Sequence, residues 1–130
     1  MENLPRYYVT NEAINSLNEK LGLPKPDKHS QDWVYEVSNS SRVAGFFSFY
    51  ENAILNMEEK FALMNLVISS YDDAIAEGKV LPGMWNGIRG QLMKHISMYK
   101  DLISYWALID EEDFEDGSAI TPYMRDLINR

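Results

Sequence analysis

The stretch Val43–Ile75, VAGFFSFYENAILNMEEKFALMNLVISSYDDAI, decides the fold of this chain. Its apolar side chains recur in alternating steps of four and three residues. They are Val43, Phe47, Tyr50, Ile54, Met57, Phe61, Met64, Ile68, Tyr71 and Ile75. This heptad spacing, which no proline interrupts, predicts a long helix that buries one face. Burial of the stripe would supply most of the stability, at roughly 1.5–3 kcal/mol for each fully buried large side chain.

The length of this stretch argues for a break in the helix. An unbroken helix would be about 50 Å long, whereas a compact chain of this size has a radius of gyration of only about 14 Å. Asp72 and Asp73 would oppose the macrodipole at the C-terminus of one long helix. They would instead stabilise the first turn of a new helix if Ser69 or Ser70 capped it. We therefore predict a helix over Arg42–Glu77 that is broken near Ser69–Ser70.

A second long helix is predicted over Gly83–Ile109, where the three-four spacing resumes after Pro82. The loop Gly78–Gly83 is short, so the two long helices are expected to form an antiparallel hairpin.

Shorter helices flank this hairpin in the prediction. Residues 1–40 form an N-terminal cap region, with one helix that begins after Thr10 and ends at Gly22. The segment Gln31–Val37 fits a strand or a helix, and a helix is favoured in an otherwise helical chain. Thr121 is expected to cap a short terminal helix. The prediction is one all-α domain, residues 1–130, with five or six helices.

Composition excludes several function classes. The net charge of −8 argues against a nucleic-acid binder, which needs a basic face. The absence of cysteine removes disulfides, thiolate metal sites and cysteine nucleophiles. Residues Met1–Arg6 lack the blocks of a signal peptide, and the apolar stretch Phe61–Tyr71 is shorter than the roughly 20 residues of a membrane helix. We expect a soluble cytoplasmic protein without membrane contact, with secretion without a signal as the alternative.

Motifs for catalysis or metal binding are not found. No Glu stands three residues before His29 or His95, as helical di-iron sites require. No carboxylate lies three or four residues from His95, where a partner on the same helix would orient it as a base. The acidic run before Gly117 has Phe114 at a position where a calcium loop needs a ligand. We expect no metal, no cofactor and no enzymatic activity; an enzyme that pairs His95 with a distant acid is the least favoured hypothesis.

The negative charge is concentrated in one segment after the second long helix. Six of the eight net charges fall within the acidic segment 110–116, so the rest of the chain sums to −2. Its members are Asp110, Glu111, Glu112, Asp113, Phe114, Glu115 and Asp116. Such a run is most often a solvated loop, but an aromatic residue among carboxylates also suits a basic protein surface. Tyr123 and Met124 could extend this surface, as could Asp72, Asp73 and Glu77 if the fold brings them near.

A small, acidic, helical chain without cysteine or a catalytic motif is similar in profile to many bacterial immunity proteins and antitoxins, although no motif carries that resemblance. It implies an inhibitor that neutralises a basic partner protein through the acidic segment. The alternative is a structural or adaptor protein that self-associates, as a homodimer for example, through the heptad stripe.

Overall fold

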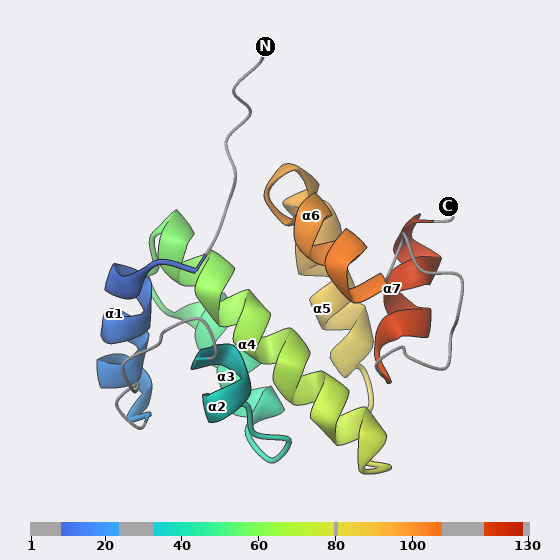
Figure 1. The fold of residues 1–130 in the computed structure, drawn as a ribbon, viewed down its shortest axis with the longest axis horizontal. Helices are drawn as coiled ribbons and strands as arrows, with labels where there is room; N and C mark the ends of the chain where they lie inside the picture. The colour runs from blue at the N-terminus through green and yellow to red at the C-terminus, as the bar shows by residue number, and fades with distance from the viewer. Residues whose placement is uncertain (1–8, 24–32, 80, 108–118, 129–130) are drawn as a thin grey trace.

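The longest helix, α4 (Met57–Ala76), crosses the molecule diagonally and separates two groups of helices (Figure 1). The computed structural model describes residues 9–23, 33–79, 81–107 and 119–128. On one side of α4 lie α1 (Asn11–Leu21), α2 (Trp33–Val37) and α3 (Val43–Asn52); on the other lie α5 (Met84–Lys94), α6 (Ile96–Ala107) and α7 (Thr121–Ile128). The described residues form seven helices and no strand, which confirms the all-α prediction.

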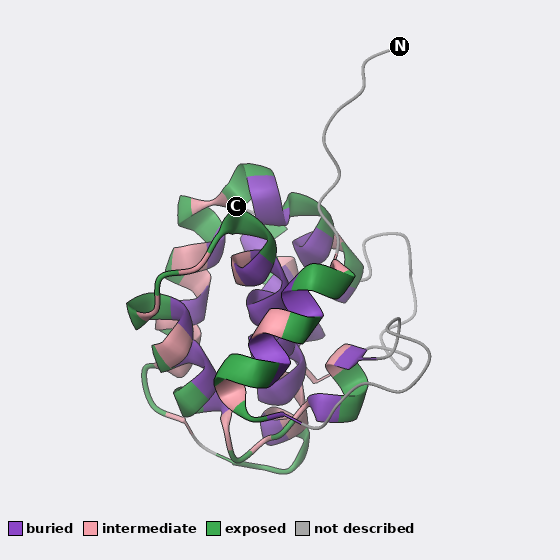
Figure 2. Cartoon of the chain, turned by 90° about the vertical axis from the view of Figure 1, so that its left-hand side faces the viewer, coloured by how far each residue is buried: buried purple, intermediate pink, exposed green. Residues whose placement is uncertain are grey.

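One hydrophobic core joins all seven helices. The buried positions of each helix face the interior and the exposed positions face outward (Figure 2). Most of the heptad stripe lies in this core, including the fully buried Met64 and Ile68. Ile54, at 97% exposure, and Met57, at 55%, are the exceptions. The stripe therefore offers no continuous apolar seam for self-association.

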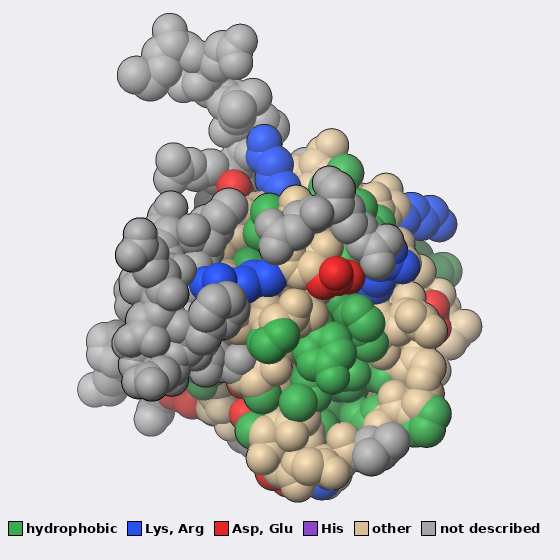
Figure 3. Space-filling model, turned by 90° about the vertical axis from the view of Figure 1, so that its right-hand side faces the viewer, with side chains coloured by type: hydrophobic (Ala, Val, Ile, Leu, Met, Phe, Trp, Pro, Cys, Tyr) green, Lys and Arg blue, Asp and Glu red, His purple; other side chains and the backbone are tan. Residues whose placement is uncertain are grey.

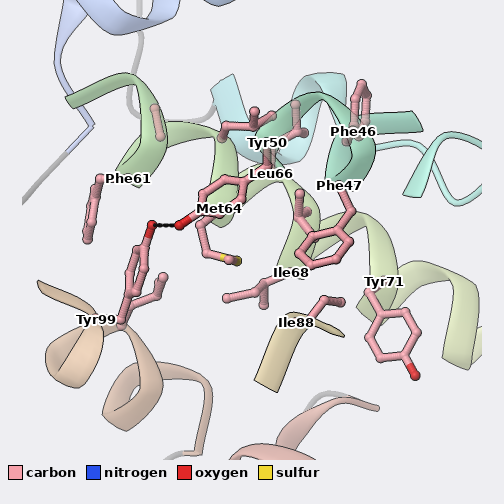
Figure 4. Close-up of a cluster of buried hydrophobic side chains, with 14 of the residues drawn as sticks. Phe46, Phe47, Tyr50, Phe61, Met64, Leu66, Ile68, Tyr71, Ile88 and Tyr99 are labelled. Atoms are coloured by element: carbon pink, nitrogen blue, oxygen red, sulfur yellow. Dashed lines mark hydrogen bonds between the residues drawn. The ribbon is translucent and has the colours of Figure 1, made fainter. Parts of the chain in front are cut away.

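The predicted break near Ser69–Ser70 is wrong, because the chain breaks between Asn52 and Met57. A capping box starts α4 here: the Asn56 side chain accepts from the Glu59 N–H at 2.7 Å, and the Glu59 carboxylate accepts from the Asn56 N–H at 3.0 Å. Reciprocal bonds of this kind satisfy two backbone donors that a helix start leaves unpaired. The break folds α3 back along α4, so the two halves of the stripe pack against each other (Figure 4).

Ser69 and Ser70 are instead buried inside α4, where they dock the connection between α2 and α3. The Ser70 hydroxyl accepts from the Asn39 N–H at 3.0 Å, and the Ser69 hydroxyl donates to Ser38 at 3.1 Å. Ser38 in turn donates to Asp73 at 2.7 Å. The serines thus satisfy polar groups between helices rather than at a helix start.

The predicted helix over Gly83–Ile109 is also interrupted. Its described part forms α5 and α6, which meet at His95, and this adds a helix to the predicted number. The predicted hairpin of two long helices is therefore wrong; the most extensive helix packing is between α6 and α7 and between α3 and α4. Helix α5 also approaches α3 closely at Gly87. A Cβ added to Gly87 would lie only 2.8 Å from the Phe47 ring.

The helix predicted between Thr10 and Gly22 is confirmed. The Thr10 hydroxyl accepts from the Ala13 N–H at 3.1 Å and caps α1, and Gly22 ends it with a φ of 64°. The segment after residue 32 is helical, as favoured. The Trp33 indole donates to the buried Asn18 side chain at 2.9 Å, so α2 is fastened to α1.

Glu59 also fastens α1 to α4. Its carboxylate accepts from Lys20 at 2.7 Å and from the Ser16 hydroxyl. Burial by itself would raise the pKa of Glu59, but the hydrogen bonds from Lys20, Ser16 and Asn56, with the charge of Lys20, outweigh it. Together they lower that pKa from 4.5 to about 2.

Replacement of Glu59 by Gln is expected to reduce the free energy of unfolding at pH 7 by about 1–3 kcal/mol, because charge-assisted hydrogen bonds are lost. Since the folded pKa of Glu59 is depressed, its stabilisation is complete above pH 4.5 and is lost as the pH falls toward about 2. The gap between wild type and Glu59→Gln should therefore narrow over that range in urea titrations. Glu51→Gln, at an exposed position, is the control; a gap that stays constant with pH would contradict the assignment.

Two glycine substitutions test the approach of α5 to α3. Gly87→Ala is expected to destabilise by about 1–3 kcal/mol, since the Phe47 ring is packed in the core and must shift. Gly90→Ala, on the same helix with nothing within 4 Å, should stabilise by about 0.5–1 kcal/mol. Chemical denaturation measures both changes. Shifts of the same sign would show that α5 does not pack on α3 in this way.

Candidate partner-binding surface

The acidic segment falls in the chain between the end of α6 and the start of α7. We call the place where these two helix ends meet the α6–α7 junction. Asp110, Glu111, Glu112, Asp113, Phe114, Glu115 and Asp116 lie outside the described residues. The ends on either side of this region are held together. The Thr121 hydroxyl donates to the Trp106 carbonyl at 2.8 Å, and the Arg125 guanidinium donates to the Ala107 carbonyl at 2.7 Å. These bonds satisfy carbonyls that the C-terminus of α6 would otherwise leave unpaired.

Thr121 is the first residue of α7 in the structure, whereas the sequence predicts it as the cap before that helix. It is buried, and its hydroxyl contacts the end of α6. The backbone N–H groups just before α7 donate instead to a carboxylate of α4.

Asp72 of α4 supplies that acceptor. Its carboxylate accepts from the Ile120 N–H at 2.9 Å and from the Ala119 N–H. Burial raises the pKa of Asp72, the two backbone bonds oppose that change, and the charge of Asp73 adds to it, with a net increase. The end of α4 is therefore tied to the place where the chain re-enters the described structure.

The other acids that could have extended the acidic surface are bonded elsewhere. Asp73 accepts from Ser38, and Glu77 accepts from Ser40 at 3.0 Å and pairs with Lys79 at 3.4 Å. Of these three acids, Asp72 alone bonds to the α6–α7 junction in the described part of the chain.

An aromatic cluster of Tyr71, Trp85 and Tyr123 lies beside this junction and joins α4, α5 and α7. The Trp85 and Tyr123 ring centroids are 5.3 Å apart, and each ring lies 6.3 Å from Tyr71. Tyr71 is buried, and burial followed by the proximity of Tyr123 raises its pKa. Tyr123 is 38% exposed, whereas Met124 is fully buried and cannot extend the surface as expected.

Hydrophobic side chains gather in one area of surface on the side of the molecule where α7 lies (Figure 3). Trp85 is partly exposed, and Tyr123 of α7 is more than one-third exposed. Tyrosine and tryptophan are common anchors in protein interfaces because they combine a large apolar face with a hydrogen-bonding group. Sequence reasoning found Tyr123 alone, since the other two rings are distant along the chain.

His95 lies at the meeting point of α5 and α6. Burial lowers its pKa, and the charges of Lys60 and Lys94 lower it further. Its charged neighbours are thus cations, which do not orient a general base. His29 lies outside the described residues.

Among the described residues, no group of three or more His, Asp and Glu side chains could hold a metal ion. Within the same ranges, no helix combines the length and apolarity needed to cross a bilayer.

The tie between α4 and α7 can be tested with Asp72→Ala. The variant leaves the Ile120 and Ala119 N–H groups without their acceptor, so we expect a loss of about 1–3 kcal/mol in unfolding free energy. Hydrogen exchange should show the largest loss of protection in α7. Asp101→Ala, at an exposed position of α6, is the control. Equal protection of α7 in both variants would contradict this role.

No protein-family model, no curated protein and no solved structure matches this chain.

Proposed function

We propose that the chain is a non-enzymatic, cytoplasmic protein-binding domain that neutralises a basic partner protein, in the manner of an immunity protein or antitoxin. The observation that carries the proposal is a juxtaposition at the α6–α7 junction. The chain region with the acidic segment leaves and rejoins the described structure there, and a partly exposed aromatic cluster lies beside it.

Charge supports the choice of partner. Six carboxylates within seven positions make a local field that attracts a basic surface and repels an acidic one. A field of this kind mainly raises the association rate. The rest of the chain, at −2, would add little to it.

The aromatic cluster supports a second contribution, which is slow dissociation. Interface anchors are typically Trp, Tyr or Arg side chains in a packed surround. Tyr123 meets that description, since its exposed ring is held by two other rings and loses little freedom on binding. The acidic residues would then control the association rate with the partner, and the aromatic rings would control the lifetime of the complex.

The proposal is tested first by affinity capture on the immobilised chain, with basic proteins eluted by salt, identified by mass spectrometry and purified. Recovery of no basic protein would contradict the proposal. With a purified partner, we expect the triple variant Asp113→Asn, Glu115→Gln, Asp116→Asn to slow association about tenfold at low salt and to flatten its salt dependence.

The matched control makes the same charge change at exposed sites of α1, α2 and α3: Glu19→Gln, Glu36→Gln, Glu51→Gln. It should change the association rate by less than about twofold. An equal effect of both triple variants would mean that net charge, and not the acidic segment, governs encounter. Tyr123→Ala should raise the dissociation rate about tenfold or more while association changes little; an unchanged dissociation rate would remove the cluster from the interface.

A further inference from the structure

A groove of about 430 Å³ lies between the start of α4 and the meeting point of α5 and α6. Its lining includes Met57 and Lys60 from α4, Lys94 at the end of α5, and His95, Ile96 and Ser97 where α6 begins. This volume falls within the range of small-molecule sites.

The polar lining of the groove is basic. Among the described residues, the titratable ones that line it are Lys60, Lys94 and His95, and none is an acid. The described part of the chain has two ion pairs, Lys20–Glu59 and Lys79–Glu77, so neither Lys60 nor Lys94 is paired there. The depressed pKa of His95 reflects burial and then these two charges. In a chain of net charge −8, this is a local concentration of uncompensated positive charge.

The backbone adds donors at the same place. Helix α6 starts at Ile96, directly after His95, and is twelve residues long. The Ile96 and Ser97 N–H groups precede the first hydrogen bonds of this helix, whereas the Met98 N–H already donates to the His95 carbonyl at 2.9 Å. The first two N–H groups therefore favour a negative group near the two lysines.

Apolar side chains form the rest of the groove wall. Met57 is 55% exposed and Ile96 is 40% exposed, which leaves considerable apolar surface in water beside the cations. A ligand that matches both features carries one acidic group and a short apolar body.

A buried tyrosine pair holds the two walls in place. The Tyr50 and Tyr99 hydroxyls lie 2.8 Å apart (Figure 4). Tyr99 also donates to the Lys60 carbonyl at 3.3 Å. Phe61 stacks on Tyr99 with ring centroids 5.9 Å apart. The backbone of Lys60 is thereby fixed to α6, so the groove exists before any ligand binds.

We propose that this groove binds a small organic anion, with the acidic group between Lys60, Lys94, His95 and the N-terminus of α6, and the apolar body against Met57 and Ile96. None of the lining residues named here belongs to the acidic segment, and the site does not depend on the proposed partner.

The proposal is tested by amide NMR titration of the full chain with phenyl phosphate, benzoate, inorganic phosphate and benzyl alcohol. Phenyl phosphate or benzoate should saturate, with the largest shifts at His95, Ile96 and Ser97, and the tighter of the two identifies the acidic group. Inorganic phosphate should bind at least about fivefold more weakly, and benzyl alcohol should not saturate. Equal affinity for inorganic and phenyl phosphate would indicate an adventitious ion only and would overturn the proposal.

Lys60→Gln with Lys94→Gln should weaken phenyl phosphate or benzoate at least about tenfold. The matched control Lys79→Gln with Lys100→Gln, which removes the same charge outside the groove, should stay within about twofold. Circular dichroism of both variants checks their folding. Equal weakening would show a response to net charge alone and contradict the site.

A peptide with the sequence of residues 110–116, DEEDFED, is the competing occupant. Binding of this peptide to the same residues, tighter than either organic anion, would overturn the small-molecule proposal in favour of a protein segment. Weaker binding of the peptide is expected.

Discussion

One carboxylate determines how this chain folds back on itself. Glu59 completes the capping box that starts α4, and it accepts hydrogen bonds from Lys20 and Ser16 of α1. The cap ends the run of helix after Asn52, so the apolar stripe buries one half against the other instead of extending along one long rod. The remaining helices pack around the core that results. A single buried acid therefore sets both the turn and the docking of the N-terminal helix.

Helix content could be predicted from the sequence, but the break could not be located by periodicity. The three-four spacing continues across the break because Ile54 and Met57, although exposed, are apolar residues at the expected positions. The change of direction therefore leaves no gap in the pattern. Two capping signals compete: Ser70 with Asp73, and Asn56 with Glu59. Both fit the rule for a capping box. What separates them is burial, since Ser70 is buried inside α4 and its hydroxyl accepts from Asn39 in the connection between α2 and α3.

The candidate site likewise has one part that the sequence predicts and one part that it does not. Charge counting identifies the acidic segment, because its signal is contiguous in sequence. The aromatic cluster is assembled from α4, α5 and α7, and nothing in the spacing of Tyr71 and Trp85 relates them to Tyr123. Asp72 illustrates the opposite case: its position suggested an extension of the acidic surface, yet it serves as a backbone acceptor for α7. The basic groove could not be predicted from the sequence either, since only tertiary packing brings Lys60 near His95.

Net charge is thus a poor guide to what the charges do in this protein. Glu59, Asp72 and Asp73 accept hydrogen bonds from donors inside the fold. These bonds stabilise the fold and partly compensate the negative charges. Lys60 and Lys94 have no such partners among the described residues, and positive charge persists there despite the overall balance. A carboxylate that supports the fold and one that recognises a partner respond differently to substitution. Substitution of the first kind of carboxylate lowers the free energy of unfolding. Substitution of the second kind leaves the free energy of unfolding unchanged and alters only binding. Stability and binding measured on the same variant therefore separate the two uses of charge.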